Sequence, residues 1–355
     1  MAGFSNLLED AVKQKASDIF IISGLGLSFK LGSEIQTNGQ ILLPEDTERI
    51  IKEAYVMAGR DPGRLVESGD DDFSVSVKGL SRFRISAYKQ RGSLAAVIRV
   101  VPFGIPDYKE LNISEDVMAI SEKSKGLVLV TGPAGGGKST TLACIINRIN
   151  STRSGHIITL EEPIEYLHRN SKSIISQREV KADTEGYVPA LRAAMRQSPD
   201  VILVGEMRDF ETISTAITAA ETGHLVISTL HSVGAANTVN RIIDVFPSNQ
   251  QQQIRVQLSQ LLQSVISQKL LPGANGGLVP AFEIMHCNNA IRNMIRESKV
   301  HQIDTVINAS MTGGMISMDN SILRLYKSGQ ITEENALAFA EAPEFMERKL
   351  RQSEK

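Results

Sequence analysis

The sequence predicts a two-domain protein, with a small α+β domain followed by a larger α/β domain that ends in helices. Short alternating stretches precede residue 101, four continuous apolar runs follow residue 125, and helical periodicity dominates after residue 249. Alternation is typical of an antiparallel sheet with one solvated face, whereas continuous apolar runs are typical of parallel strands buried on both faces. We therefore expect an antiparallel sheet first, then a parallel sheet covered by helices, then a helical C-terminal region.

The first domain is expected to span residues 1–101. Its opening segment, NLLEDAVKQKA, has apolar residues at helical spacing and predicts a helix. The later stretches DFSVSVKG and SRFRISAYKQRG alternate between apolar and polar residues and predict antiparallel strands. Residues 102–115 contain two prolines with mixed polarity on either side, so we interpret them as the linker between the domains.

The second domain is expected to span residues 116–355. Four apolar runs, GLVLVTG, HIITL, DVILVGE and HLVISTLH, each predict a buried strand, and helical segments such as STTLACIINRIN and DFETISTAITAAETG separate them. From Asn249 the segment NQQQQIRVQLSQLLQSVISQKL has apolar residues at helical spacing through Val265 and Ile266, so it predicts a long helix. The later segment NNAIRNMIRES predicts an amphipathic helix with Asn289 as its N-cap.

Composition limits the possible functions. With 38 basic and 40 acidic residues, the net charge of -2 gives no general attraction to nucleic acid or anionic lipid. No apolar run approaches the roughly 18 to 20 residues of a membrane span, and the opening MAGFSNLLED carries acids where a signal peptide carries lysines, so we expect a cytoplasmic protein. Cys144 and Cys287 belong to no CxxC pair, so neither a disulfide framework nor a zinc site is expected.

A glycine-rich segment, GPAGGGKS, fits the pattern G-x-x-x-x-G-K-[ST] and lies between an apolar run and a helical segment. Its backbone N–H groups and the helix N-terminus suit phosphate oxygens, while Lys138 suits the outer phosphates and the Ser139 hydroxyl suits Mg²⁺. A turn that only caps a helix is the alternative, and the order of strand, loop and helix favours nucleotide binding. The expected nucleotide-binding residues are Gly132, Pro133, Ala134, Gly135, Gly136, Gly137, Lys138, Ser139 and Thr140.

Acids and histidines follow the other apolar runs. Glu206 ends DVILVGE, where a carboxylate on a strand beside the phosphate-binding strand can hold Mg²⁺ directly or through water; capping the next helix is its alternative role. His224 and His231 lie at opposite ends of one predicted strand, so we expect different roles for them. In ITLEEPIEYLH, adjacent strand residues point in opposite directions, so Glu161 and Glu162 are not expected to share a role.

Six motifs in a fixed order carry a resemblance to a known family. GPAGGGKSTTL, TLEEPIEYLH, SQREV, DVILVGEMRD, TAAETGHLVISTLH and AIRNMIRE resemble the hexameric secretion ATPases of the type IV pilus and type II secretion superfamily. The similarity is greatest to the retraction ATPases of twitching motility and extends from about Ser17 to about Pro343. It implies a PAS-like N-terminal domain, a RecA-like ATPase domain, ATP and Mg²⁺ as cofactors, and a homohexamer that works beneath an inner-membrane pilus platform protein and acts indirectly on pilin.

The resemblance also implies roles for matching residues. Glu161 corresponds to the general base, Glu206 with Ser139 to the Mg²⁺ site, and His231 to the residue that senses the γ-phosphate. By composition, the cations between Lys78 and Arg99 form a solvated strand face, whereas the resemblance implies that N-terminal arginines reach a neighbouring subunit's nucleotide. The candidates for that role are Arg84 and Arg99, with Arg82 behind them.

Two departures from the family pattern concern the site. Glu162 stands where the family usually has aspartate, which adds one methylene at a position where placement matters. Ala134 and Gly136 stand where the family usually has threonine and serine, and the phosphate-binding loop keeps its backbone donors regardless. The AIRNMIRE helix is associated with retraction in the family, so we interpret it as a coupling element.

Other functions remain as alternatives. A pilus-assembly or type II secretion ATPase usually has an extra N-terminal domain and a cysteine-rich zinc insertion, which this chain is not expected to have. The accessory retraction ATPase of the same machinery is a second alternative. A nucleic-acid motor would use a basic channel with stacking aromatic residues, whereas this sequence has no Trp and 5% aromatic residues. A nucleotide-binding switch without hydrolysis is the last alternative, and the acids and histidines argue against it.

Overall fold

The computed structural model describes residues 3–32, 34–101, 104–310 and 314–353. The chain divides into two compact units, one formed by Met1–Gly104 with Glu165–Leu167 and the other by Ile105–Ile164 with His168–Lys355. Residues 102 and 103, which begin the expected linker, lie outside the described residues. We call the two units the N-terminal unit and the C-terminal unit and describe each by itself.

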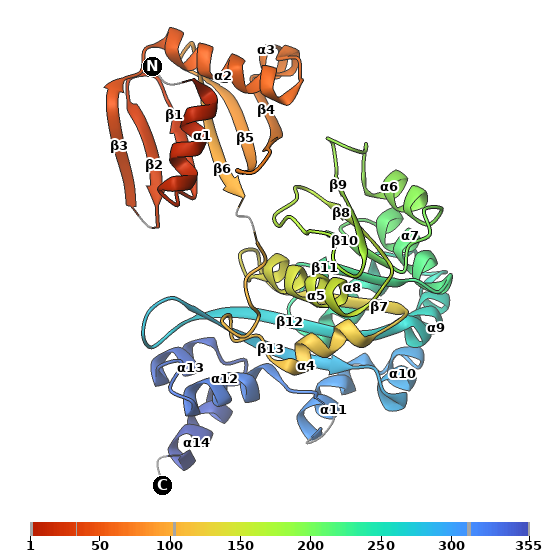
Figure 1. Ribbon diagram of the computed structural model, residues 1–355. Helices are drawn as coiled ribbons and strands as arrows, with labels where there is room; N and C mark the ends of the chain where they lie inside the picture. The colour runs from red at the N-terminus through yellow and green to blue at the C-terminus, as the bar shows by residue number, and fades with distance from the viewer. Residues whose placement is uncertain (1–2, 33, 102–103, 311–313, 354–355) are drawn as a thin grey trace. The chain divides into compact units, whose positions relative to one another are not determined.

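The N-terminal unit is a six-stranded antiparallel sheet in the order β3-β2-β1-β6-β5-β4 (Figure 1). Three helices, α1 (Phe4–Lys13), α2 (Pro44–Ala58) and α3 (Gly63–Ser68), contribute apolar residues to a core on one face of this sheet. Alternation in β5 buries Phe83 and Ile85 in that core and leaves Arg82 and Arg84 on the other face, as predicted. The strands are β1 (Asp18–Ile21), β2 (Gly26–Leu31), β3 (Glu34–Ile41), β4 (Asp70–Val77), β5 (Ser81–Gln90) and β6 (Ser93–Val101).

The C-terminal unit is built on a seven-stranded sheet in the order β13-β12-β7-β11-β10-β8-β9, in which only β13 is antiparallel to its neighbour. The four predicted apolar runs form the central strands, and all of β7, β10 and β11 is buried. The strands are β7 (Gly126–Thr131), β8 (His156–Glu161), β9 (Ile174–Glu179), β10 (Val201–Val204), β11 (Leu225–Leu230), β12 (Leu262–Pro272) and β13 (Leu278–His286).

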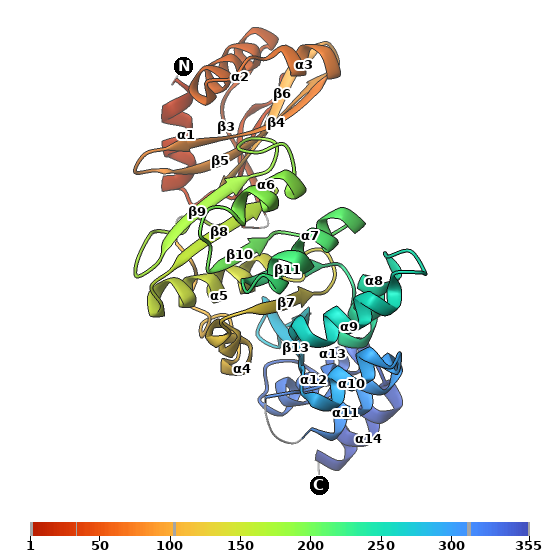
Figure 2. The ribbon, with the colours of Figure 1, turned by 90° about the vertical axis from the view of Figure 1, so that its right-hand side faces the viewer.

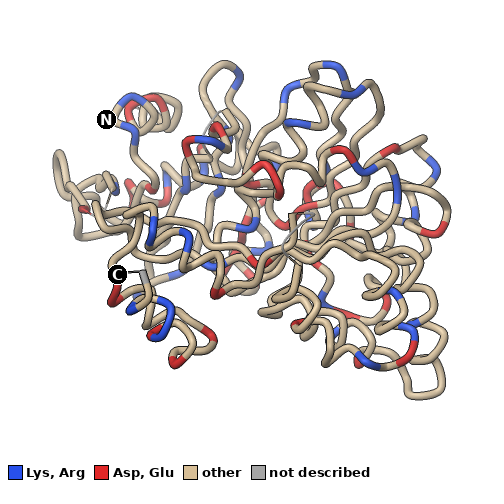
Figure 3. Tube along the Cα trace, turned by 90° about the horizontal axis from the view of Figure 1, so that it is seen from below, with Lys and Arg blue, Asp and Glu red and all other residues tan. Residues whose placement is uncertain are grey.

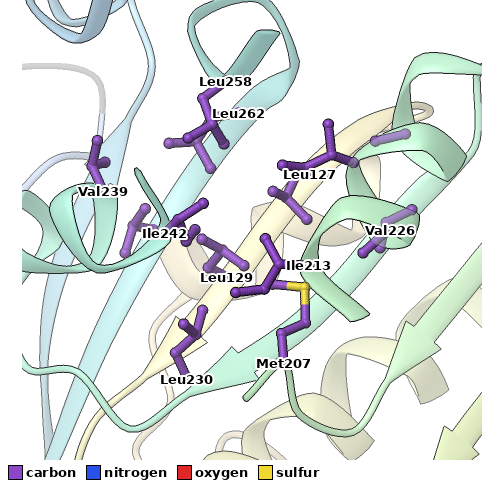
Figure 4. Packing of buried hydrophobic residues seen from close by; sticks show 14 of the residues in the cluster. Leu127, Leu129, Met207, Ile213, Val226, Leu230, Val239, Ile242, Leu258 and Leu262 are labelled. Carbon is purple, nitrogen blue, oxygen red and sulfur yellow. The ribbon is translucent and has the colours of Figure 1, made fainter. Parts of the chain in front are cut away.

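Helices cover both faces of this sheet (Figure 2). One face packs against α4 (Glu115–Met118), the short η1 (Ala119–Glu122) and α5 (Lys138–Thr152). The other face packs against α6 (Tyr187–Ala194), α7 (Phe210–Glu221), α8 (Ala235–Asp244) and α9 (Gln251–Leu261). Figure 4 shows this second core, where Leu127 and Leu129 of β7 meet Ile213 of α7 and Ile242 of α8. Burying each such aliphatic side chain contributes about 1.5–3 kcal/mol, so this core fixes the strands that carry the site.

The C-terminal helices are α10 (Asn289–Arg296), η2 (Val300–Gln302), α11 (Ile303–Ala309), α12 (Met318–Lys327), α13 (Glu333–Phe339) and α14 (Pro343–Ser353). The last three pack with β12 and β13 around a small separate core. In α10 the N-cap is Asn288, whose Oδ1 accepts the Ile291 amide proton at 3.0 Å, and not Asn289 as the sequence predicted. Among the described helices, none combines the length and the apolar character that crossing a membrane requires.

The long helix predicted from Asn249 is wrong in its second half. Helix α9 ends at Leu261, and β12 begins at the next residue. Val265 and Ile266 contribute to the cores on opposite faces of the sheet, which only a strand between two layers permits. Pairing with β7 on one side and β13 on the other overrides the helical spacing, so the helical C-terminal region begins only at Asn289.

Candidate active site at the carboxyl ends of the central strands

The sheet register brings the ends of four strands together. Thr131 of β7 is paired with Leu230 of β11, and Val204 of β10 is paired with both Ser228 of β11 and Leu160 of β8. The residues that follow these positions therefore meet at one edge of the sheet. They are Gly132, His231, Gly205 with Glu206, and Glu161.

One detail of this order differs from the prediction. We expected Glu206 on a strand directly beside the phosphate-binding strand, but β11 lies between β7 and β10. The strand that carries His231 therefore separates the phosphate-binding loop from the acid. His224 lies at the opposite end of β11, where its Nδ1 is 2.9 Å from the Ala219 carbonyl at the end of α7. The two histidines thus occupy opposite edges of the sheet.

The glycine-rich segment is the loop between β7 and α5. Gly132 has φ 137°, and a Cβ built there would lie 2.2 Å from the Gln268 carbonyl oxygen, so only glycine fits. Lys138 begins α5, and its Nζ donates to the Gly132 and Pro133 carbonyls at 2.8 Å. The hydroxyls of Ser139 and Thr140 lie in the first helical turn, where backbone N–H groups have no partner within the helix. This loop has the close backbone approach, helix N-terminus, lysine and hydroxyl that phosphate binding uses.

A residue that sequence reasoning missed supports this loop. The Gln268 side chain is 2% exposed, and its Oε1 accepts the Thr141 hydroxyl of α5 at 2.8 Å. A Cβ built at Gly137 would lie 2.8 Å from the Gln268 Nε2, so the amide also lies against the loop itself. Gln268 was missed because its segment was predicted as a helix, and an uncharged amide in such a segment gives no signal of its own.

Glu161 ends β8, and two side chains fix its carboxylate. Its Oε1 accepts the Thr159 hydroxyl at 2.6 Å and the Gln177 amide Nε2 at 3.2 Å. The Gln177 Oε1 in turn accepts the His168 backbone N–H at 2.8 Å, so Gln177 joins Glu161 to the backbone beyond the turn. Gln177 belongs to the SQREV stretch on β9, and nothing in that stretch alone identified it as a support of Glu161.

Glu162 has different partners, in keeping with the alternation of side chains along a strand. Its carboxylate forms an ion pair with Lys181, and the peptide bond that follows it, to Pro163, is cis. Beyond this turn, the Ile164 amide donates to Glu179 Oε2 at 3.1 Å, and Glu179 is 5% exposed. The turn after Glu161 is therefore held by side chains other than Glu161.

Glu206 and His231 are brought together. The Glu206 Oε2 lies 3.3 Å from the His231 Nε2 and 2.7 Å from the Arg208 Nε, and the Glu206 side chain is 15% exposed. Tyr187, at the start of α6, lies in the same acidic neighbourhood. Burial raises the pKa of its hydroxyl above the ordinary value, and the carboxylates of Glu206, Glu162 and Glu161 raise it further. One partly buried phenol thus lies near the carboxylates of Glu161, Glu162 and Glu206.

Arg84 and Arg99 lie in the N-terminal unit, directly opposite each other on β5 and β6. Arg99 Nε donates to the buried carboxylate of Asp18 at 3.0 Å, and the Arg99 side chain is 66% exposed. Arg82 donates to the Ser76 hydroxyl at 3.1 Å. Arg84 and Arg99 therefore lie side by side on the face of the sheet opposite the core that the helices cover.

The comparisons with known proteins agree with this chemistry. The family described as "Type II/IV secretion system protein" matches residues 3–281. The chain is 43% identical to the "Type IV pilus retractation ATPase PilT" of Pseudomonas aeruginosa, over 96% of this chain and 98% of that protein. It is 48% identical to the "Twitching motility protein" of Neisseria gonorrhoeae, over 86% of this chain and 83% of that protein.

A solved structure gives the same result for the fold. The "Crystal Structure of the Pilus Retraction Motor PilT and Bound ADP" superposes with a TM-score of 0.90 at 44% identity, and the match covers 98% of this chain and all of that one. The expected mixed α/β architecture is thereby confirmed. A phosphate-binding loop, two strand-end acids and a histidine at one sheet edge are the parts that an ATPase needs. The chain therefore belongs to the type II/IV secretion ATPase family and, within that family, to the pilus retraction ATPases.

Proposed function

We propose that this ATPase drives retraction of type IV pili, and hence twitching motility, as a homohexameric ring. The observation that carries the proposal is the correspondence with a named retraction ATPase over almost the whole length of both chains. The ring would work at the cytoplasmic face of the inner membrane, against a platform protein of the pilus machinery, and would act on pilin only through that platform.

In the proposed reaction, Glu161 accepts a proton from the water that attacks the γ-phosphate. Thr159 and Gln177 hold one carboxylate oxygen from two directions, which fixes the rotamer before the substrate arrives. The loop from Gly132 to Thr140 holds the phosphates through its backbone donors and Lys138. Adenine nucleotide suits this site because the related motor was solved with ADP.

The residues present also fit Mg²⁺. Ser139 offers a hydroxyl and Glu206 a carboxylate, and Mg²⁺ prefers such oxygen ligands and keeps several waters. When bound, Mg²⁺ would neutralise charge on the phosphates. His231 lies 3.3 Å from the Glu206 carboxylate, so a change in hydrogen bonding at the γ-phosphate can be passed between these two side chains.

Arg84 and Arg99 are proposed to act on the nucleotide of an adjacent subunit. A guanidinium that reaches the transferring phosphoryl group can supply about 10³ to 10⁵ in rate. Turnover then depends on how neighbouring subunits are arranged, which is how hydrolysis becomes motion. Arg84 is the first candidate because Arg99 already has Asp18 as its ion-pair partner.

A nucleic-acid motor is the alternative from another class. In Figure 3 the Lys and Arg positions are interspersed with Asp and Glu positions along the trace, with no long stretch of blue or of red. The near balance of 38 basic and 40 acidic residues agrees with this mixture and favours a protein substrate. Stimulation of the ATPase by DNA at low salt would reverse this preference.

The experiment is a deletion in the source organism, complemented with the wild type or with Glu161→Gln, and scored for surface pili and twitching. Pili that accumulate without retracting, in both the deletion and the Glu161→Gln strain, support the proposal. Loss of surface pili contradicts it and indicates an assembly ATPase. If pili accumulate only when a second retraction ATPase is also deleted, the chain has the accessory role.

A further inference from the structure

The loop that follows His231 is tied to the β12–β13 hairpin. This loop leads into α8, whose N-cap residue is Gly234 and therefore has no side chain to cap the helix. The first two donors are accepted from outside instead. The Gly234 N–H donates to the Ser267 Oγ of β12 at 3.0 Å, and the Ala235 N–H donates to the Glu283 Oε1 of β13 at 2.6 Å. Ser267 and Glu283 are directly paired across the hairpin.

The Glu283 carboxylate also reaches a second helix. The backbone amide of Met318, the first residue of α12, lies close enough to the Glu283 carboxylate to lower its pKa, and the N-cap residue Ser317 makes no side-chain capping bond. One buried carboxylate thus accepts from the N-terminus of α8 and lies near that of α12, where helix dipoles favour negative charge. The Glu283 side chain therefore lies between α8, the helix that follows His231, and α12.

Burying the Glu283 carboxylate costs more desolvation free energy than a helix cap requires. It is 6% exposed, and burial raises its pKa to about 7 although the amides of Ala235 and Met318 act to lower it. The carboxylates of Glu341 and Asp304 raise the pKa further, and Lys269 forms an ion pair with Glu341 at 3.0 Å. Neutral side chains could cap either helix with a smaller desolvation cost, so stability alone does not account for a carboxylate here.

We propose that Glu283 is a positioning residue for His231, holding the start of α8, and with it the loop from His231 to Gly234, in fixed relation to α12. The inference rests on the proposed role of His231 at the γ-phosphate. It adds a route by which a change at the nucleotide reaches the C-terminal helices, through a contact outside the six sequence motifs.

The test combines hydrogen exchange and steady-state kinetics on the full chain. In Glu283→Gln the side chain keeps its size, but one oxygen that accepts a helix N–H becomes an NH₂ group. We expect faster exchange at the Ala235 or Met318 amide, kcat lower by about 10- to 100-fold from misplacement of His231, and a KM for ATP within about twofold. In a His231→Ala background, Glu283→Gln should lower kcat no further, because the residue it positions is already absent.

Two further variants keep the test decisive. Ser267→Ala removes only the acceptor of the Gly234 amide, and it should shift kcat in the same direction by a smaller factor if Glu283→Gln does not fold. Asp304→Asn removes a nearby carboxylate and leaves the acceptors of the Gly234 and Ala235 amides in place, so it should leave kcat within about twofold. Unchanged exchange at Ala235 and Met318, or a full additional loss of kcat in the His231→Ala background, overturns the inference. Full activity of His231→Ala alone instead overturns the proposed role of His231.

Discussion

The two units present their charged side chains in opposite ways. In the C-terminal unit, Glu161, Glu206 and His231 lie where buried parallel strands end, and each has defined partners within a few ångströms. In the N-terminal unit, Arg84 and Arg99 lie in the middle of antiparallel strands, on the face opposite the core. Among the described residues, Arg84 forms no ion pair with an acid.

The acids and His231 are brought together by the fold of a single subunit, whereas the proposed role of the arginines needs a neighbouring subunit. The strand-end residues are brought to the same end of the sheet by its register within one subunit. The sheet-face arginines have no such register partner among the phosphate-binding elements, so their proposed role depends on assembly. A subunit mutated in one of these regions should therefore complement a subunit mutated in the other region, but not one mutated in the same region.

The largest effect is expected at the sheet face. Arg84→Ala should lower kcat by about 10³-fold or more if the guanidinium stabilises the transferring phosphoryl group. Mixing these subunits with Lys138→Ala subunits should restore part of the activity, because a site is complete wherever the Arg84→Ala subunit binds the nucleotide and the Lys138→Ala subunit supplies the arginine. Absence of rescue in mixed rings that are shown to form would break the comparison. Arg99→Ala is the matched variant, and its smaller expected loss reflects its ion pair with Asp18.

The next effect is expected at the strand end. Glu161→Gln should lower kcat by about 10² to 10⁴ while ATP binding, measured with a fluorescent analogue, stays unchanged. Mixing Glu161→Gln subunits with Lys138→Ala subunits should restore no activity, because both changes lie in the half of the site that one subunit supplies. Glu162→Gln is the control, because Glu162 pairs with Lys181 and not with Thr159 or Gln177. A dead Glu162→Gln beside an active Glu161→Gln would reverse the two assignments.

A smaller effect is expected at Gln177, which donates a hydrogen bond to Glu161. Gln177→Leu removes the amide that donates to Glu161 at 3.2 Å, and a hydrogen bond to a charged group contributes about 1.5–3 kcal/mol. We expect kcat to fall about tenfold or somewhat more, with KM nearly unchanged. Ser176→Ala, on the same strand, removes a hydrogen bond to His156 instead and should leave kcat at the wild-type level. Equal kinetics for the two variants would mean that Glu161 is positioned without Gln177.

The smallest effect is expected away from both regions. Arg292 Nη1 donates to the Ser259 and Gln260 carbonyls at 2.7 and 2.9 Å, at the end of α9 where the chain becomes β12. Arg292→Ala should lower the free energy of unfolding by about 1 kcal/mol, and the ATPase rate in solution should stay within about twofold. Urea unfolding of Arg292→Ala and of Arg296→Ala, which lacks these two contacts, checks this. A loss of ATPase with unchanged stability would make Arg292 part of the catalytic machinery.

The sequence predicted the parallel core well because its strands are buried on both faces. Runs such as GLVLVTG and HLVISTLH have no competing helical period, and the glycine-rich loop identified their functional edge. It failed at β12, where Ile254, Leu258, Leu262 and Val265 fit a helix as well as a helix followed by a strand, and where no glycine or proline marks the change. The position of β11 between β7 and β10 was also missed, because strand order depends on packing between distant segments.

The supporting residues were harder to predict than the acids. Gln177 and Gln268 are uncharged, and Glu283 is a single acid in an apolar strand. Each gains its role from contacts with elements far away in the sequence, as when Gln268 meets Thr141 of α5. The spacing of residues within a motif gives no information on such contacts. They become visible only when the pairing register of the strands is known.

The central place of β11 limits which parts of the motor can move. This strand is fully buried and hydrogen-bonded to a parallel neighbour on each side, with six paired positions to β7 and four to β10. Sliding it by one residue would turn every core side chain to the wrong face, so we expect the sheet to keep its register during the cycle. Displacement caused by hydrolysis is then expected in segments beyond the strand ends, and the short span between His231 and α8 follows this strand directly at the site.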